Sequence, residues 1–405
     1  MALIPTEEAL ARVLAGAGAL DAETVPVGEA HHRVLASAVI AGRTTPAADV
    51  SAMDGYAVRA ADVATVPVTL TLAGEAAAGR PHDGTLQSGE TVRVFTGGVI
   101  PAGADAVVIQ EDTRREGERI TMLEATTRGR HVRFAGGDFA KGDIVLQAGH
   151  RLTARDLALA AAADHANLEV VRRPRVGIFA TGDELVPPGT GAGPHQVILS
   201  NIYAVGALAR LAGAEVVDLG RLADTPDATR AGLTSALAAD LDVLVTTGGA
   251  SVGDHDLVAP TLLGLGIELA VHKIALRPGK PLMFGHANAT RILGLPGNPV
   301  SAHVCALLFL VPLLRRLQGE TAGVDRLPLT PAELGVDLKA NDLRMDFMRA
   351  EIIGRGARGP IVRPLPVQDS SMLRLLARAD ALLVRPPHAP AGRAGDACDI
   401  VLLND

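Results

Sequence analysis

The middle of the chain contains three nearly continuous apolar runs separated by two helical segments, and this alternation constrains the fold most strongly. The predicted strands are 176–181, 215–220 and 240–247, and the predicted helices between them are 200–214 and 225–239. Strands that are apolar on both faces are typical of a parallel sheet covered by helices on each side. The sequence therefore predicts a doubly wound, three-layer α/β domain, which we bound at residues 174–319.

The segments on either side of this domain are richer in strands. Residues 45–143 contain short β-type runs separated by Gly, Pro and Asp turns, which predicts an inserted β-rich domain II. Residues 1–44 and 144–173 flank that insertion and form the two parts of an elongated N-terminal domain I. Residues 320–405 contain further short strands and form a C-terminal β-rich domain IV. We therefore expect an α/β multidomain chain, since 405 residues exceed what one core accommodates.

Composition excludes several classes of function. No window approaches the ~18 uninterrupted apolar residues that a membrane span requires, and the first residues lack the basic segment of a signal peptide. Two cysteines, Cys305 and Cys398, form no disulfide framework or metal spacing. The net charge of −7 and the absence of Trp argue against a nucleic-acid partner. We expect a cytoplasmic protein with no membrane or nucleic-acid partner.

Three glycine-rich loops follow predicted strands of the α/β domain. They are ATGDEL (180–185), TTGGASVGD (246–254) and LPGNPVSA (295–302). Ligands of such domains bind beyond the carboxyl ends of the strands, where glycines let backbone N–H groups approach an anion. Any one loop is also explained as a tight turn, but three at one edge favour a phosphate site. None matches the P-loop or the complete dinucleotide-binding pattern.

Acidic and basic residues accompany these loops. The acids of the α/β loops are Asp183, Glu184, Asp224, Asp254 and Asp256, and Asp54 and Asp138 lie in similar glycine-flanked loops of the β-rich insertion. Carboxylates beside phosphate-binding glycines favour Mg²⁺, although the preference of Asp for turns explains some of them equally well. Lys273 and Lys280, two of only four lysines, bracket Arg277. Together these residues predict a site for a phosphorylated small molecule and Mg²⁺.

Eight motifs in the same order along nearly the whole chain carry a resemblance to a known family. They are SAMDGYAV (51–58), TGGVIPAGADAVV (96–108), RFAGGDFAKGD (133–143), ATGDEL, SN (200–201), GGASVGDHD (248–256), RPGKP (277–281) and LPGNPVSA. The chain resembles the molybdopterin molybdenumtransferases, the bacterial molybdenum insertases, which are similar to the E domain of gephyrin. Each motif is modest alone, but the set is specific.

The resemblance implies insertion of molybdenum from molybdate into adenylated molybdopterin, with Mg²⁺-dependent release of AMP. It also implies an elongated homodimer whose active cleft lies between domain II of one chain and domains III and IV of the other. A molybdopterin adenylyltransferase and apo-molybdoenzymes are the implied partners. The protein would act by positioning and electrostatic neutralisation, because no Ser or Cys in the loops has an obvious His partner.

Site residues are carried over by matching motif. The implied catalytic residues are Asp54, Thr96, Arg133 and Asp138 in domain II, with Lys273, Arg277 and Lys280 holding phosphate or molybdate. The implied substrate-binding residues are Gly182, Glu184, Ser200, Asn201, Gly248, Gly249, Ser251, Gly253, Pro296, Gly297, Asn298 and Pro299, with Arg349 and Ser370 near the oxyanion. The implied Mg²⁺ ligands are Glu184, Asp224 and Asp256.

Two alternatives use the same α/β domain. A molybdopterin adenylyltransferase shares the glycine-rich loops but lacks the long N- and C-terminal modules, and it would consume ATP. A non-catalytic scaffold of the gephyrin type would cluster proteins without turnover. The placement of acids and lysines in the loops favours the insertase.

Overall fold

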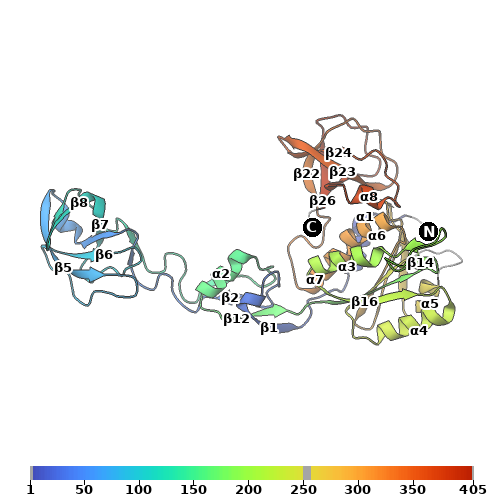
Figure 1. The fold of residues 1–405 in the computed structure, drawn as a ribbon, viewed down its shortest axis with the longest axis horizontal. Helices are drawn as coiled ribbons and strands as arrows, with labels where there is room; N and C mark the ends of the chain where they lie inside the picture. Colours follow the sequence, from blue (N-terminus) through green and yellow to red (C-terminus); the bar gives the residue numbers. More distant parts are fainter. Residues whose placement is uncertain (1–2, 250–256, 404–405) are drawn as a thin grey trace.

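The computed structural model describes residues 3–249 and 257–403. The molecule is elongated, with the β-rich insertion at one end and the α/β and C-terminal domains together at the other (Figure 1). A slender N-terminal domain connects the two ends.

Six strands form the sheet of the α/β domain: β13 (Arg175–Thr181), β16 (Glu215–Leu222), β17 (Val243–Thr247), β18 (Leu269–Lys273), β20 (Pro281–Ala287) and β21 (Thr290–Leu295). Their order is β16-β13-β17-β21-β20-β18. The first four run parallel, as the apolar runs predicted, and β20 and β18 extend the sheet as antiparallel neighbours, which the sequence did not predict. Parallel β13, β17 and β21 therefore end at one edge.

Helices cover both faces of this sheet, which confirms the three-layer α/β fold. The helices are α1 (Thr6–Leu14), α3 (Asn201–Leu211), α4 (Pro226–Leu237), α5 (Val258–Gly264), α6 (Pro299–Cys305), the π-helical η4 (Ala306–Leu310) and α7 (Val311–Leu317). Ile178 of β13 packs in a core with α1, α3, α6, η4 and α7. Its neighbour Phe179 points to the other face and packs with α4 and α5. Helix α1, which the sequence assigned to the N-terminal domain, thus packs on the α/β domain.

The helical stretch Pro299–Leu317 is the one part of the described chain long and apolar enough to cross a membrane, by length and composition alone. Of its most apolar window, 72% is buried inside the protein, as in the core helix of a globular domain. Pro299 occupies its first turn, as predicted.

The N-terminal half consists of a two-part connecting domain and a β module. The connecting domain contains β1 (Ala22–Pro26) paired with β12 (Asn167–Val171), β2 (Val39–Ile40) paired with β11 (Ile144–Leu146), η1 (Val27–Glu29) and α2 (Ala154–Ala162). The β module contains β3 (Val50–Ser51), β4 (Gly55–Val58), η2 (Ala60–Val63), β5 (Val68–Ala76), β6 (Glu90–Val94), β7 (Ala106–Ile109), η3 (Gln110–Asp112), β8 (Thr113–Glu116), β9 (Arg119–Met122) and β10 (Val132–Arg133). It has a six-stranded sheet, of order β7-β4-β6-β5-β9-β8, and a separate β3–β10 pair. Antiparallel pairing of segments flanking the module closes the connecting domain.

The sheet of the C-terminal domain includes one strand that belongs to the α/β domain in the sequence. Its elements are β22 (Thr330–Leu334), β23 (Met345–Gly356), β24 (Gly359–Pro364), α8 (Leu373–Leu376), β25 (Ala381–Arg385) and β26 (Ala397–Leu402). Strand β19 (Leu276–Arg277) pairs parallel to β23 and becomes an edge of this sheet. Phe347 and Leu382 lie in the same buried cluster as Ile178. The two domains therefore share one core, which fixes their relative position.

Candidate active site

A cleft of about 1280 Å³ lies between the α/β domain and the C-terminal domain. Its floor is formed by the three glycine-rich loops that follow β13, β17 and β21, and the short pair β14 (Leu185–Val186) and β15 (Val197–Ile198) contributes an apolar wall. The predicted site residues that line it are Glu184, Ser200, Asn201, Gly248, Gly249, Arg277, Lys280, Pro296, Gly297, Asn298, Pro299 and Ser370. Residues far apart in the sequence thus meet at one sheet edge.

The loop after β17 needs glycine for its backbone course. Gly248 and Gly249 have φ angles of 87° and 68°, in the left-handed region that L side chains rarely adopt. A Cβ on Gly249 would also lie 2.4 Å from the side chain of Val258. The loop can therefore approach the opposite loops closely only because these two positions carry no side chain.

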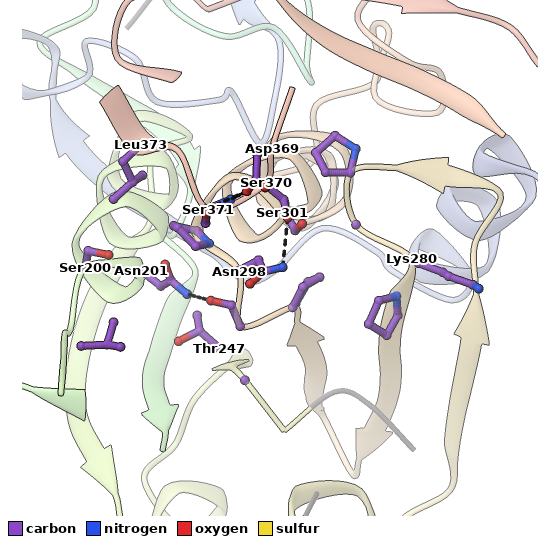
Figure 2. A pocket seen from close by; sticks show the side chains of 18 of the residues that line it. Ser200, Asn201, Thr247, Lys280, Asn298, Ser301, Asp369, Ser370, Ser371 and Leu373 are labelled. Carbon is purple, nitrogen blue, oxygen red and sulfur yellow. Dashed lines mark hydrogen bonds between the residues drawn. The ribbon is translucent and has the colours of Figure 1, made fainter. Parts of the chain in front are cut away.

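The LPGNP turn is held from both sides by amide side chains (Figure 2). The Asn201 side-chain amide donates to the Gly297 carbonyl at 2.7 Å, and the Asn298 amide donates to the Ser370 hydroxyl at 3.0 Å. The backbone N–H of Val300 also donates to the Ser370 carbonyl at 3.1 Å. The two bonds to Ser370 tie the first turn of α6 to the C-terminal domain, and the Asn201 bond ties the same turn to α3.

Arg349, expected near the oxyanion, lies beneath the loop that carries Ser370. It is 1% exposed and donates to the carbonyls of Asp369 at 2.7 Å and Val367 at 3.3 Å. Desolvation lowers the pKa of its guanidinium, although the nearby Asp369 opposes this effect. In this structure Arg349 positions the loop of residues 367–370 and does not reach the cleft surface.

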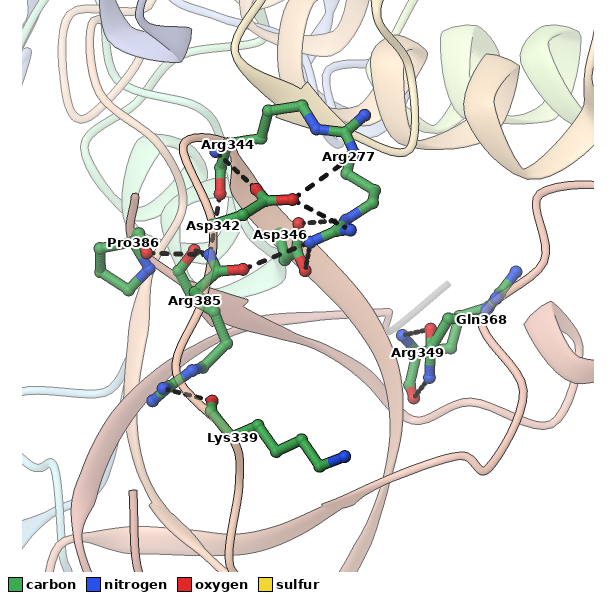
Figure 3. A network of polar contacts seen from close by, with 10 residues as sticks. Arg277, Lys339, Asp342, Arg344, Asp346, Arg349, Gln368, Arg385 and Pro386 are labelled. Carbon is green, nitrogen blue, oxygen red and sulfur yellow. Dashed lines mark hydrogen bonds and ion pairs between the residues drawn. The ribbon is translucent and has the colours of Figure 1, made fainter. Parts of the chain in front are cut away.

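The three predicted cations of the RPGK region have different surroundings. Lys280 is exposed and projects from the cleft wall (Figure 2). Arg277 lines the cleft but forms a bidentate ion pair with Asp346, with Nε and Nη2 each 2.6 Å from a carboxylate oxygen (Figure 3). That contact raises the pKa of Arg277. Lys273 ends β18 and lies outside the cleft lining. Lys280 therefore presents the more accessible charge to a ligand.

The acids that follow β13 and β16 lie close together. The backbone N–H of Asp183 donates to the Asp224 carboxylate at 3.3 Å, and the Asp224 N–H donates back to Asp183 at 3.1 Å. Desolvation raises the pKa of Asp224, and the negative charges of Asp183 and Glu184 add to the rise. A divalent cation would relieve this repulsion, so these carboxylates suit a hard metal ion chemically.

The described part of the chain contains no group of three or more His, Cys, Asp or Glu side chains that could hold a metal by itself. The third predicted Mg²⁺ ligand, Asp256, lies outside the described residues, as do Ser251 and Gly253. Gly182, which was predicted to bind substrate, lies two residues before Glu184 and has a φ angle of 147°. The metal assignment therefore stays a prediction.

The predicted domain II residues form a separate, exposed rim. Thr96 donates its N–H and its hydroxyl to the Asp54 carboxylate at 2.8 and 2.9 Å, and both bonds lower the pKa of Asp54. Arg133 lies opposite Val50 in the β3–β10 pair, a few residues from Asp54. Asp138 lies on the loop that follows, where its N–H donates to Thr45 at 3.1 Å. Within one chain this rim and the cleft lie at opposite ends of the molecule (Figure 1).

Several cleft residues were not singled out from the sequence. Ser301 lies within the LPGNPVSA motif, Gln368, Asp369, Ser371 and Leu373 lie within the QDSSML stretch around Ser370, and Arg344 lies outside every motif. A signal was available for Arg344, because the stretch NDLRMD places three charges at the start of β23. Their convergence on the cleft depends on the pairing of β19 with β23, which no local pattern encodes.

Three family models match the chain in succession. Residues 4–163 match the MoeA N-terminal region (domain I and II), residues 177–316 match a probable molybdopterin binding domain, and residues 331–403 match the MoeA C-terminal region (domain IV). Together the matches cover both the cleft and the distant rim.

Curated relatives and solved structures agree with these matches. A molybdopterin molybdenumtransferase of Nostoc sp. is 40% identical over 75% of this chain and 71% of the relative. One of Bacillus subtilis is 33% identical over 99% of this chain and 94% of the relative. The crystal structure of the molybdopterin biosynthesis moeA protein from Pyrococcus horikoshii has a TM-score of 0.85 at 29% identity, covering 99% of this chain and 100% of that chain. The chain therefore belongs to the molybdopterin molybdenumtransferase family of molybdenum cofactor biosynthesis enzymes.

Proposed function

We propose that this chain inserts molybdenum from molybdate into adenylated molybdopterin and releases AMP in an Mg²⁺-dependent step. The observation that carries the proposal is the size and lining of the cleft. Most small-molecule pockets measure about 300–1000 Å³, and a cleft of about 1280 Å³ suits a larger ligand with both a pterin and a nucleotide part. Family membership supports the same substrate class.

The cleft lining suits an anionic ligand with flat, apolar parts. Gly248 and Gly249 expose backbone to the cleft, and α3 begins at its edge, so N–H groups and a helix dipole favour a phosphate. Lys280 adds a full positive charge. Val197 and Ile198 offer exposed apolar surface on one wall. The residues thus match a phosphorylated heterocycle better than a small apolar metabolite.

In this reaction the substrates supply the reacting groups. The dithiolene sulfurs of the pterin replace oxygen ligands of molybdate, and those oxygens leave as water after taking up the thiol protons and protons from solvent. A water molecule cleaves the phosphoanhydride bond, which releases AMP and leaves the phosphate on the pterin. The described cleft offers no Ser or Cys with a paired His, so we assign it positioning and charge neutralisation. Lys280 and the glycine loops would hold the anions. The LPGNP turn, which Asn201 and Asn298 fix, would keep the pterin part of the substrate in position.

Mg²⁺ would be held by Glu184 and Asp224, with Asp256 as a third ligand. When bound, the ion neutralises phosphate charge during release of AMP. Burial raises the pKa of Asp224, and the negative charges of Asp183 and Glu184 add to that rise, which supports this placement because a cation would offset the clustered charge.

We further propose a homodimer in which domain II of one chain reaches the cleft of the other. The separation of the Asp54 rim from the cleft within one chain supports this arrangement (Figure 1). Only a second chain could then bring Asp54, Thr96, Arg133 and Asp138 to the substrate. A molybdopterin adenylyltransferase and apo-molybdoenzymes would be transient partners in the cytoplasm, delivering the substrate and accepting the product.

The proposal is tested by AMP release from adenylated molybdopterin with Mg²⁺, with and without molybdate, followed by reactivation of a molybdenum-free apoenzyme. We expect AMP release that depends on molybdate, together with reactivation. Net consumption of ATP to form the adenylate would instead identify an adenylyltransferase. A folded dimer that releases no AMP would overturn the proposal in favour of a scaffold.

A further inference from the structure

A hollow of about 440 Å³ lies on the sheet of domain II, and its lining includes Tyr56, Arg93, Phe95, Gln110 and Arg115. The hollow adjoins the Asp54 rim, because Phe95 directly precedes Thr96, which donates two hydrogen bonds to the Asp54 carboxylate. Arg93 belongs to no motif that the sequence analysis used. Its surroundings connect it to the rim acid in two ways.

Aromatic rings and a neutral amide hold the guanidinium of Arg93. Its Cζ lies 5.0 Å from the ring centroid of Tyr56 and 5.0 Å from that of Phe95, and Nη2 donates to the side-chain oxygen of Gln110 at 2.6 Å. None of the ion pairs formed within residues 3–249 and 257–403 includes Arg93. Stacking on aromatic rings fixes a guanidinium without cancelling its charge. Arg93 is therefore held in place and keeps its positive charge.

Gln110 connects Arg93 to the backbone of the rim. The Gln110 N–H donates to the Asp54 carbonyl at 3.1 Å, while the Gln110 side chain accepts from Arg93. Arg93 also acts on Asp54 through space. The Thr96 hydrogen bonds lower the pKa of Asp54 most, and the positive charge of Arg93 adds to that effect. One arginine thus supports both the position and the ionised form of the rim acid.

We propose that Arg93 is a positioning residue for the reaction, which fixes Asp54 through Gln110 and keeps a positive charge beside the Asp54 carboxylate. The inference rests on the proposed function, because it requires Asp54 to act on the substrate. Arg93 acts through Asp54 and not by binding substrate. Its loss should therefore lower kcat and leave KM unchanged, since a displaced catalytic group weakens stabilisation of the transition state alone.

Arg93→Met removes the charge and the donor but keeps an apolar chain that can pack on the two rings. We expect kcat for AMP release to fall about tenfold with KM unchanged. Arg93→Lys keeps a positive charge and a donor, so it should lose less of kcat, and it is the variant to compare if Arg93→Met lowers the thermal midpoint. Wild-type kcat in both variants, or a rise in KM alone, overturns the inference.

The matched control is Arg115→Met, which removes the same charge from the same hollow. Arg115 is exposed, and its Nε donates to the Gly117 carbonyl at 3.0 Å, away from Gln110. This variant should keep wild-type kcat and KM. A loss of kcat equal to that of Arg93→Met would show a general effect of charge and would contradict a specific role for Arg93.

The Asp54 pKa provides a test that needs no turnover. Carbon-13 NMR of the carboxyl groups measures it during a pH titration, with Asp54→Asn identifying the signal. Besides Arg93, the charged groups on the elements beside Asp54 are Glu90 of β6, Glu111 and Asp112 of η3 and Arg133 of β10, and all four stay unchanged in these variants. Removing a nearby positive charge disfavours the ionised carboxylate, so Arg93→Met should raise the Asp54 pKa and Arg115→Met should not.

The two measurements separate this inference from the proposed function. A wild-type protein that releases no AMP contradicts the proposed function, and the NMR titration then still decides whether Arg93 acts on Asp54. An Asp54 pKa that is the same in the wild-type and Arg93→Met proteins overturns the inference, even where the wild-type protein releases AMP. A raised Asp54 pKa together with a lower kcat, both absent from Arg115→Met, supports it.

Discussion

The rim of domain II and the cleft of the other two domains differ in how they hold charge. On the rim, the Asp54 carboxylate accepts its hydrogen bonds from Thr96, and Arg133 and Asp138 are exposed. In the cleft, Arg277 is paired across a domain boundary with Asp346. Acids and cations that lie close together form ion pairs, as Arg277 and Asp346 do. Because the acids of the rim lie far from the cleft cations of the same chain, they do not pair with those cations and stay available for a ligand (Figure 1).

The two regions also differ in rigidity. The cleft walls share one buried core and one sheet, because β19 belongs to the chain of one domain and to the sheet of the other. The rim is joined to that body through the thin connecting domain (Figure 1). Substitutions on the rim should therefore affect activity with little effect on stability, and substitutions under the cleft should affect both.

The largest expected effect is on turnover at the rim. Asp54→Asn should lower kcat by about 10²–10³, the cost of losing one preorganised electrostatic contact, with no change in thermal midpoint. Because the Thr96 hydrogen bonds lower the pKa of Asp54, its ionised form should persist to a lower pH than for an ordinary Asp. The measurement is the pH profile of AMP release with the midpoint of unfolding.

Asp83→Asn is the control, since it removes another exposed carboxylate of the same domain. It should leave kcat unchanged. Wild-type turnover by both Asp54→Asn and Asp138→Ala would remove the rim from the active site.

Under the cleft, Arg349→Met should affect stability and activity together. The variant loses two hydrogen bonds that the buried guanidinium donates to the carbonyls of Asp369 and Val367, both exposed residues, so we expect a loss of about 2–3 kcal/mol in the free energy of unfolding. Urea denaturation gives this value, and KM should rise because the Ser370 loop loses its support. Arg374→Met, on the exposed face of α8, should change neither quantity. A stable Arg349→Met protein with a high KM would mean that Arg349 contacts the ligand directly.

The smallest expected effect is that of Asp224→Asn on the metal-free protein. The pKa of Asp224 is raised above its ordinary value of 3.8, so its ionised form opposes folding. The free-energy penalty that this ionisation imposes on folding is absent well below pH 3.8. It grows as the pH rises toward the raised folded-state pKa and is complete above that pKa. The variant should match or slightly exceed wild-type stability near neutral pH.

Added Mg²⁺ should then raise the thermal midpoint of the wild-type protein and leave that of Asp224→Asn unchanged. Thermal unfolding at several pH values, with and without Mg²⁺, measures both effects. An equal Mg²⁺ response in the two proteins would place the metal elsewhere.

The fold could be predicted further from sequence than the site. Three apolar runs predicted β13, β16 and β17 and their parallel arrangement, because burial on both faces leaves a local pattern. The antiparallel strands β18 and β20 and the exchange of β19 between domains could not be predicted. Both depend on which distant strand offers a free edge, and that information is spread over the whole chain.

The site was predictable where a motif fixes the backbone. The glycines after β17 and the LPGNP turn lie in the cleft because their conformations belong to the loop itself. Arg349 shows the opposite case, since its motif could not reveal that it points under the loop at 1% exposure. Asp346 was missed for the same reason, because its role arises from its ion pair with Arg277, 69 residues away.

The most direct test of a site shared between two chains is complementation between two inactive variants. Asp54→Ala removes the rim acid and Lys280→Ala removes the cleft cation, so each homodimer should be inactive. After subunit exchange, half of the dimers contain both variants, and each mixed dimer has one intact site. The mixture should recover about a quarter of wild-type AMP release. No recovery, with subunit exchange demonstrated, would contradict a site built from both chains.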